Sequence, residues 1–87
     1  MKTLIQMVAF GEGRFEPMRA VHFVEADQEF EVELDSGAVG LLSNAKLRRA
    51  NKLPSVPTPV DSIWIDGETK AGFFVRYADG TTAEASL

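Results

Sequence analysis

Carboxylate side chains occupy every second position of one short stretch of the chain. The six acids are Glu25, Asp27, Glu29, Glu31, Glu33 and Asp35. Apolar residues at Phe30, Val32 and Leu34 alternate with the last of them, which is typical of a strand with one buried face. If the whole stretch formed one strand, all six carboxylates would share its solvent face. Neighbours would then lie about 6.8 Å apart, because a strand rises about 3.4 Å per residue.

Such a row of carboxylates has three interpretations. It could be a polar face that keeps strand edges from associating. It could recognise a basic patch on a protein partner, because complementary charge speeds association and sets register. It could also imitate the phosphates of a nucleic-acid backbone. A metal site is disfavoured, since nothing in the sequence resembles the calcium-binding loop D-x-[DN]-x-[DN]-G.

A compact basic segment follows the acidic row. Its members are Lys46, Arg48, Arg49 and Lys52, with no acid among them. These cations could contact phosphate, or they could match the acidic row of the same domain or of a neighbouring copy. The net charge of −4 favours a charge match, either within the domain or between the copies of a homo-oligomer, over nucleic-acid binding.

Three aromatic residues in the second half of the chain are candidate contacts for a partner: Trp64, Phe74 and Tyr77. Small barrels can use such rings to hold a cation, although packing in the core is the alternative. Phe73 and Phe74 are adjacent, so they point to opposite faces of a strand. One of the two must therefore lie under a second layer or be exposed at an interface.

The sequence contains no motif that is typical of a catalytic or cofactor-binding site. The chain has no cysteine and one histidine, His22, which is expected to pack or to form a hydrogen bond within a short apolar strand. There is no G-x-S-x-G nucleophile elbow. Gly11-x-Gly13 does not lead into the helix that a phosphate-binding loop requires. We therefore expect a binding protein with no catalytic residue, no metal and no cofactor.

The elements that position these residues are predicted to be mainly strands. Residues 1–10 are apolar on both faces, 21–23 and 30–34 are short strands, and Asp35-Ser36-Gly37 is a hairpin turn. The stretch 38–43 favours a strand, although a short helix near 38–45 also fits its pattern. Further strands are expected at 62–66, 73–77 and 81–87. The prediction is a small barrel or a two-sheet β-meander sandwich.

The chain is expected to form one domain over residues 1–87, with a proline-rich connector at 54–59 between two halves, 1–53 and 60–87. Phe30-x-Val32 reappears as Phe73-x-Val75, which suggests a duplicated meander or simply two similar hairpins. The apolar stretch at residues 1–10 is too short for a membrane span, contains Gln6 and has no cleavage site behind it, so the cytoplasm is the expected location.

The pattern Phe30-x-Val32, followed by Ala38-x-x-Leu41 and Ala45, resembles small phage-encoded accessory proteins. The hairpin rhythm also resembles small SH3-like barrels. The first resemblance implies a virion accessory protein or an inhibitor of a host factor. From the sequence we expect an interaction module that binds a basic protein surface. The alternatives are a self-assembling structural subunit and a nucleic-acid mimic or binder.

Overall fold

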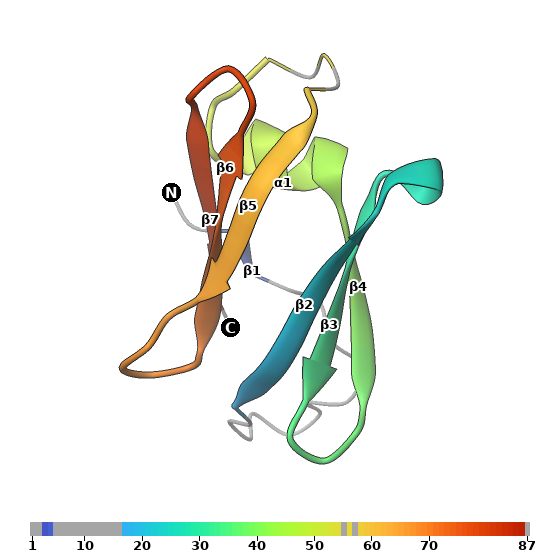
Figure 1. Cartoon of the computed structure of the whole chain (residues 1–87), viewed down its shortest axis with the longest axis vertical. Helices are drawn as coiled ribbons and strands as arrows, with labels where there is room; N and C mark the ends of the chain where they lie inside the picture. Colours follow the sequence, from blue (N-terminus) through green and yellow to red (C-terminus); the bar gives the residue numbers. More distant parts are fainter. Residues whose placement is uncertain (1–2, 5–16, 55, 57, 87) are drawn as a thin grey trace.

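Two antiparallel three-stranded meanders pack face to face in the computed structural model, which describes residues 3–4, 17–54, 56 and 58–86 (Figure 1). The first sheet has the order β2-β3-β4, with β2 at Met18–Val24, β3 at Glu29–Leu34 and β4 at Val39–Ser43. The second has the order β1-β7-β6-β5, with β1 at Thr3–Leu4, β5 at Val60–Ile65, β6 at Gly72–Tyr77 and β7 at Thr82–Ser86. The expected mainly β, two-sheet sandwich is confirmed.

The core lies between the sheets because alternate residues of each strand point inward. Phe30, Val32 and Leu34 of β3 face Phe73, Val75 and Tyr77 of β6, and the rings of Phe30 and Phe73 lie 5.5 Å apart. The buried apolar residues are Met18, Phe30, Val32, Leu34, Leu42, Leu47, Phe73, Val75, Tyr77, Ala83 and Ala85. Burying each of the larger side chains stabilises the fold by about 1.5–3 kcal/mol.

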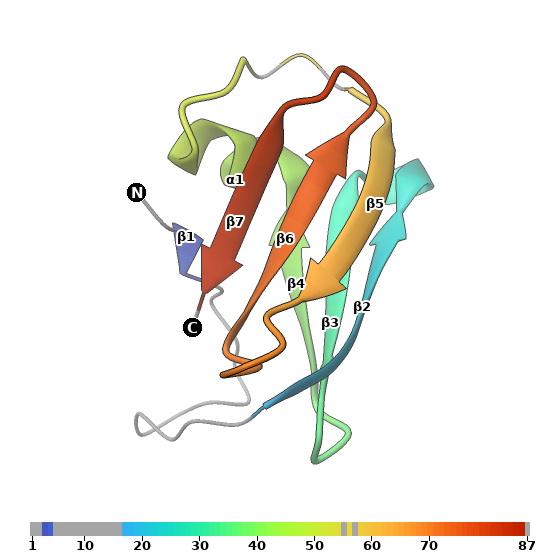
Figure 2. The same cartoon turned by 60° about the vertical axis from the view of Figure 1, so that its left-hand side comes forward.

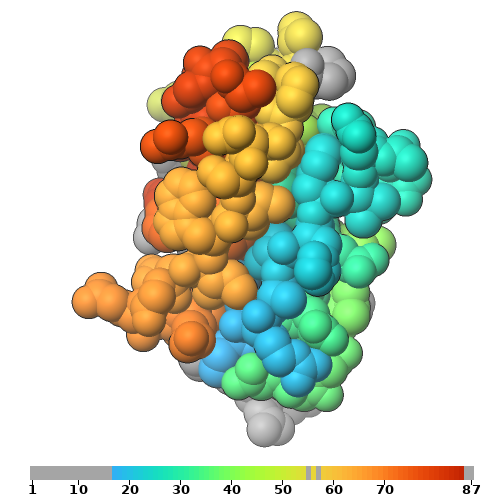
Figure 3. Space-filling view, in the orientation of Figure 1, coloured from blue at the N-terminus to red at the C-terminus, as the bar shows by residue number. Residues whose placement is uncertain are grey.

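The two sheets also meet along one edge, where β2 packs against β5 (Figures 1 and 3). The backbone N–H of Met18 donates a 2.9 Å hydrogen bond to the carbonyl of Lys70, which precedes β6. At the opposite edge of the second sheet, β1 runs parallel to β7 (Figure 2). The N-terminal half therefore contributes a strand to the sheet formed by the C-terminal half.

The two meanders share their irregularities as well as their order. Register shifts occur between Met18 and Ala20 in β2 and between Val60 and Ser62 in β5. The hairpins that follow β3 and β6 each contain a glycine with positive φ, 94° at Gly37 and 91° at Gly80. Phe30 and Phe73, which the sequence pattern relates, therefore lie at corresponding positions of β3 and β6, the central strands of the two meanders.

The single α-helix in the described part of the chain, α1, spans Asn44–Ala50. The prediction of a helix near 38–45 placed it too early, whereas the favoured strand is confirmed over Val39–Ser43. These residues pair with β3, which removes them from any helix. Ser43 then caps α1, because its hydroxyl accepts a 3.2 Å hydrogen bond from the N–H of Lys46. Ser36 lies in the preceding hairpin, as predicted.

Some expectations concern residues outside the described ranges. The predicted first strand is described only at Thr3–Leu4, and Gly11-x-Gly13 is not described. In the connector at 54–59, Pro54, Val56 and the last two residues are described. Pro59 accepts a 2.8 Å hydrogen bond from the N–H of Ala78 just before β5 begins. Among the described residues, no helix is long and apolar enough to cross a membrane.

Candidate binding surfaces

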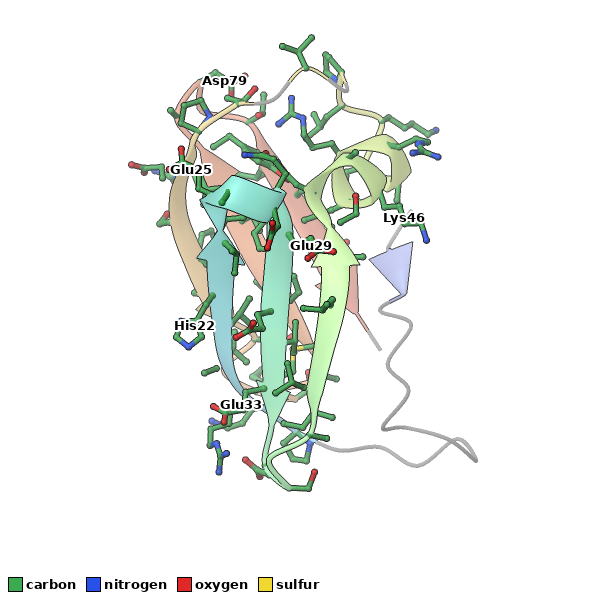
Figure 4. The ribbon with its side chains drawn as sticks, turned by 90° about the vertical axis from the view of Figure 1, so that its right-hand side faces the viewer. His22, Glu25, Glu29, Glu33, Lys46 and Asp79 are labelled. Carbon is green, nitrogen blue, oxygen red and sulfur yellow. The ribbon has the colours of Figure 1, made fainter. Side chains whose placement is uncertain are left out.

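The acidic row is divided among three elements, so the condition under which all six carboxylates would share one strand face is not met. Glu29, Glu31 and Glu33 lie in β3, Glu25 and Asp27 lie in a 3-10 turn, and Asp35 lies in the hairpin (Figure 4). Gln28 causes the break.

Gln28 adopts a left-handed conformation with φ 52°. Its backbone N–H and its side-chain amide donate to the carbonyl of Glu25 at 3.2 and 3.0 Å. The backbone carbonyl of Gln28 accepts a 2.9 Å hydrogen bond from the N–H of Asn44. The start of α1 therefore stabilises the turn that ends the row at Glu29.

The outer face of the first sheet combines the three β3 carboxylates with apolar side chains. The antiparallel register places His22, Glu31 and Leu41 in one row across the sheet, and Ala20, Glu33 and Val39 in the next. Val39 is 47% exposed and Leu41 is 52% exposed. We call this surface the acidic face and define it by Glu29, Glu31, Glu33, Val39 and Leu41.

His22 is exposed on this outer face, beside Glu31 (Figure 4). The expectation that it packs in an apolar strand is wrong, because the register directs Val21 and Phe23 inward and His22 outward. Across the described ranges, no three His, Cys, Asp or Glu side chains are arranged to hold a metal ion.

The basic segment does not form one surface. Lys46, Arg49 and Lys52 are exposed, whereas Arg48 is 2% exposed and belongs to the core. The carboxylate of Glu33 pairs at 3.0 Å with Arg19 of the adjacent β2. The sequence suggested that the basic segment could pair with the acidic row of the same domain. At Glu33 the pairing cation is instead Arg19, from the neighbouring strand.

Arg48 holds α1 against the second sheet. Its Nε donates a 2.7 Å hydrogen bond to the carbonyl of Pro54, and its guanidinium carbon lies 4.4 Å from the centre of the Tyr77 ring. Its Nη1 is buried with no hydrogen-bond partner in the described part of the chain. Because it is enclosed, Arg48 is a structural residue and cannot serve in the basic contact patch predicted from the sequence.

Tyr77 is also internal, so its assignment as an exposed aromatic contact is wrong. It is 1% exposed, and its hydroxyl donates a 2.7 Å hydrogen bond to Oδ1 of Asn44. Burial raises the pKa of Tyr77 above its ordinary value, and the neighbouring Arg48 cation opposes part of that rise.

Trp64 and Phe74 lie on the outer face of the second sheet. Trp64 is 45% exposed and stacks on Phe74, with the ring centres 5.6 Å apart and the planes inclined by 25°. Phe73, the neighbour of Phe74, is fully buried. The expectation that the two adjacent phenylalanines point to opposite faces is confirmed.

A hollow of about 350 Å³ opens beside the stacked rings. It is lined by Asn51, Trp64, Phe74, Thr82, Ala83 and Glu84, and we call it the aromatic hollow. Glu84 and Asn51 were not among the residues selected from the sequence. Glu84 is directly opposite Phe74 in the register of β6 and β7. That relationship follows from strand pairing and leaves no motif in the sequence.

Comparison of the chain with protein-family models, with curated proteins and with solved structures found no match in any of the three. The acidic face and the aromatic hollow are the two candidate binding surfaces on the described part of the chain.

Proposed function

We propose that this chain is a non-enzymatic interaction module that binds a basic protein surface through the acidic face. One observation carries the proposal: the central strand of the first sheet presents Glu31 and Glu33 directly opposite the exposed side chains of Leu41 and Val39. Glu29 lies next along the same strand face, opposite Ser43. Apolar contact area with charges alongside is the usual composition of a protein interface.

A requirement for solubility would explain the carboxylates of β3, but it does not explain the exposed apolar side chains of β4. A strand face that only had to remain in water would favour polar residues at positions 39 and 41. Instead, two large apolar side chains lie on the same side of β4, next to Glu33 and Glu31. A partner that covers them would gain stability from removing apolar area from water.

The charges indicate which partner surface fits. Adjacent carboxylates of β3 are separated by about 6.8 Å, and their repulsion costs little while they are in water. A partner with lysine or arginine side chains around an apolar centre would complement both the row and the apolar pair. Such complementarity mainly accelerates association, and salt weakens the acceleration.

The test compares two variants with the same net charge. Glu29→Gln with Glu31→Gln removes two carboxylates from the acidic face, while Asp61→Asn with Glu68→Gln removes two exposed carboxylates from the second sheet and its loop. Both variants change the formal net charge from −4 to −2, because two of the 13 acids are lost. Glu33 is left intact, since it pairs with Arg19.

The immobilised full chain and both variants are used to capture proteins from the source cells, and captured partners are then measured as purified proteins. We expect the acidic-face variant to associate about three- to tenfold more slowly at low ionic strength. The matched control should behave like the parent chain. Equal capture by all three would contradict the proposal.

Two further measurements separate the alternatives. Leu41→Thr should weaken binding at every salt concentration, because it removes apolar contact without changing charge. Light scattering on the purified chain reports self-association. A dimer that the acidic-face variant dissociates would show that the partner is a second copy, as expected for the self-assembling subunit.

A further inference from the structure

The aromatic hollow lies on the opposite side of the sandwich from the acidic face, on the sheet that faces the viewer in Figure 2. Its row across the strands is Trp64 of β5, Phe74 of β6 and Glu84 of β7, because Phe74 pairs with both of the others. The stacked rings and the carboxylate therefore line one side of the sheet together.

The polar groups around the hollow restrict what it can hold. The Asn51 amide is occupied: Nδ2 donates to the carbonyls of Leu47 at 2.8 Å and Glu84 at 3.1 Å, and Oδ1 accepts from the N–H of Glu84 at 3.1 Å. Thr82 adds a hydroxyl. Among the described residues that line the hollow, Glu84 supplies the one ionisable side chain.

We propose that the aromatic hollow is a second binding site, which accepts a cationic side chain, lysine or arginine, from a peptide or protein. The faces of Trp64 and Phe74 attract a cation through their ring quadrupoles, and the Glu84 carboxylate supplies the opposite charge. The apolar stem of the ligand packs on the rings. A volume of about 350 Å³ is at the small end of ligand sites and suits one side chain.

Other ligand chemistries fit less well. A sugar needs several free donors and acceptors, yet the Asn51 amide is already bonded to the backbone of Glu84 and Leu47. An anion would meet the Glu84 carboxylate. Arg76 lies next along β6 on the same outer face, opposite Thr82. The positive charge of Arg76 should weaken the binding of a cationic ligand in the hollow. Removing that charge should therefore strengthen the binding of a cation and weaken the binding of an anion.

The experiment uses the full chain and a blocked tripeptide, acetyl-Gly-Arg-Gly-amide, with the neutral isostere acetyl-Gly-citrulline-Gly-amide as its control. Trp64 is the one tryptophan of the chain, so its fluorescence reports the hollow directly. Two-dimensional NMR locates the contact independently. We expect a saturable change centred on Trp64, Phe74 and Ala83, with the citrulline peptide binding at least about fivefold more weakly.

Four variants identify the interaction. Glu84→Gln and Phe74→Leu should each weaken binding of the arginine peptide about two- to fivefold, and Arg76→Gln should strengthen it. Glu68→Gln, which removes one exposed carboxylate from the loop between β5 and β6, should leave it unchanged. NMR spectra confirm that each variant is folded.

The proposal is overturned if the citrulline peptide binds equally well, if the shifts centre on the acidic face, or if Glu84→Gln and Glu68→Gln have equal effects. It is also overturned if no peptide binds at concentrations that saturate weak sites. The acidic face has its own test, which uses the double variant Glu29→Gln with Glu31→Gln and a protein partner, so failure of the aromatic hollow to bind leaves that test unaffected.

Discussion

The hydroxyl of Tyr77 donates a 2.7 Å hydrogen bond to Oδ1 of Asn44, joining the last residue of β6 to the first residue of α1. The same Asn44 side chain donates through Nδ2 to Oε1 of Gln28 at 3.2 Å. One buried amide thus connects the second sheet, the helix and the turn that limits the acidic row. Each of these groups is far from the others in sequence.

Removing the tyrosine hydroxyl should destabilise the fold without changing its shape. Tyr77→Phe keeps the ring under Arg48 but leaves Oδ1 of Asn44 without this donor in a buried position. We expect a loss of about 1–2 kcal/mol in the free energy of unfolding, measured with urea. Asn44→Ala and the double variant complete a cycle, and purely additive losses would show that the two residues are not coupled.

The pKa of Tyr77 should make the fold less stable in alkali. Burial raises that pKa in the folded state, with Arg48 opposing the rise, while in the unfolded chain the pKa of Tyr77 lies near its ordinary value of 10.0. The folded state therefore retains its proton where the unfolded state has lost it. This contribution is complete below about pH 10 and is lost as the pH rises through the folded pKa.

Tyr77 is the one tyrosine of the chain, so tyrosinate absorbance follows it alone. Its midpoint should be higher in the folded protein than in urea. Tyr77→Phe should also flatten part of the fall in stability between about pH 9 and pH 11, which assigns that part to Tyr77. Identical midpoints in the two states would contradict this assignment.

Arg48 should matter for stability, whereas its neighbour Arg49 should not. Arg48→Ala leaves the Pro54 carbonyl unpaired and removes the guanidinium from the Tyr77 ring, so we expect a loss of about 1–3 kcal/mol. Arg49 is exposed, and Arg49→Ala should change stability by less than about 0.5 kcal/mol.

A third variant separates packing from hydrogen bonding at the same position. Arg48→Met fills much of the volume and removes the buried Nη1, which has no partner among the described residues, so it should cost less than Arg48→Ala. Similar losses for all three variants in urea denaturation would show that the burial of Arg48 has no energetic consequence.

The two hairpin glycines should be equally intolerant of a side chain. Gly37 and Gly80 have φ values of 94° and 91°, and a Cβ added at either meets no atom within 4 Å. The cost of alanine is therefore backbone strain, about 1–2 kcal/mol at each position. Gly67 has equal space but no left-handed φ, so Gly67→Ala should be neutral or stabilise by about 0.4–1 kcal/mol. Thermal melts of the three variants measure the difference, and equal values would contradict it.

Several features of the fold could be predicted because they depend on neighbouring residues. The alternation through Phe30, Val32 and Leu34 requires one buried face, and the same spacing recurs through Phe73, Val75 and Tyr77. Asp35-Ser36-Gly37 places glycine where the hairpin needs a positive φ. The opposite directions of Phe73 and Phe74 follow from the pleat alone.

The limits of the acidic row could not be predicted, because they depend on a contact across the fold. Six alternating carboxylates are compatible with one long strand, and residues 26–28 fit a turn as well as a continuation of that strand. In the structure the chain turns there, and the Gln28 carbonyl accepts a hydrogen bond from Asn44, sixteen positions later. The start of α1 was ambiguous for the same reason, since pairing with β3 decides that Val39–Ser43 is a strand.

The sequence by itself determined the mainly β architecture, the inward faces of β3 and β6 and their hairpin turns, because these depend on periodicity and local backbone preference. Only the tertiary structure decided which charged and aromatic residues are accessible. Arg48 and Tyr77 are internal because α1 packs against β6 and β7, while Glu84 joins Trp64 and Phe74 through strand register. Burial of a side chain and the register between strands depend on residues that are distant in the chain. A local sequence pattern therefore cannot predict them.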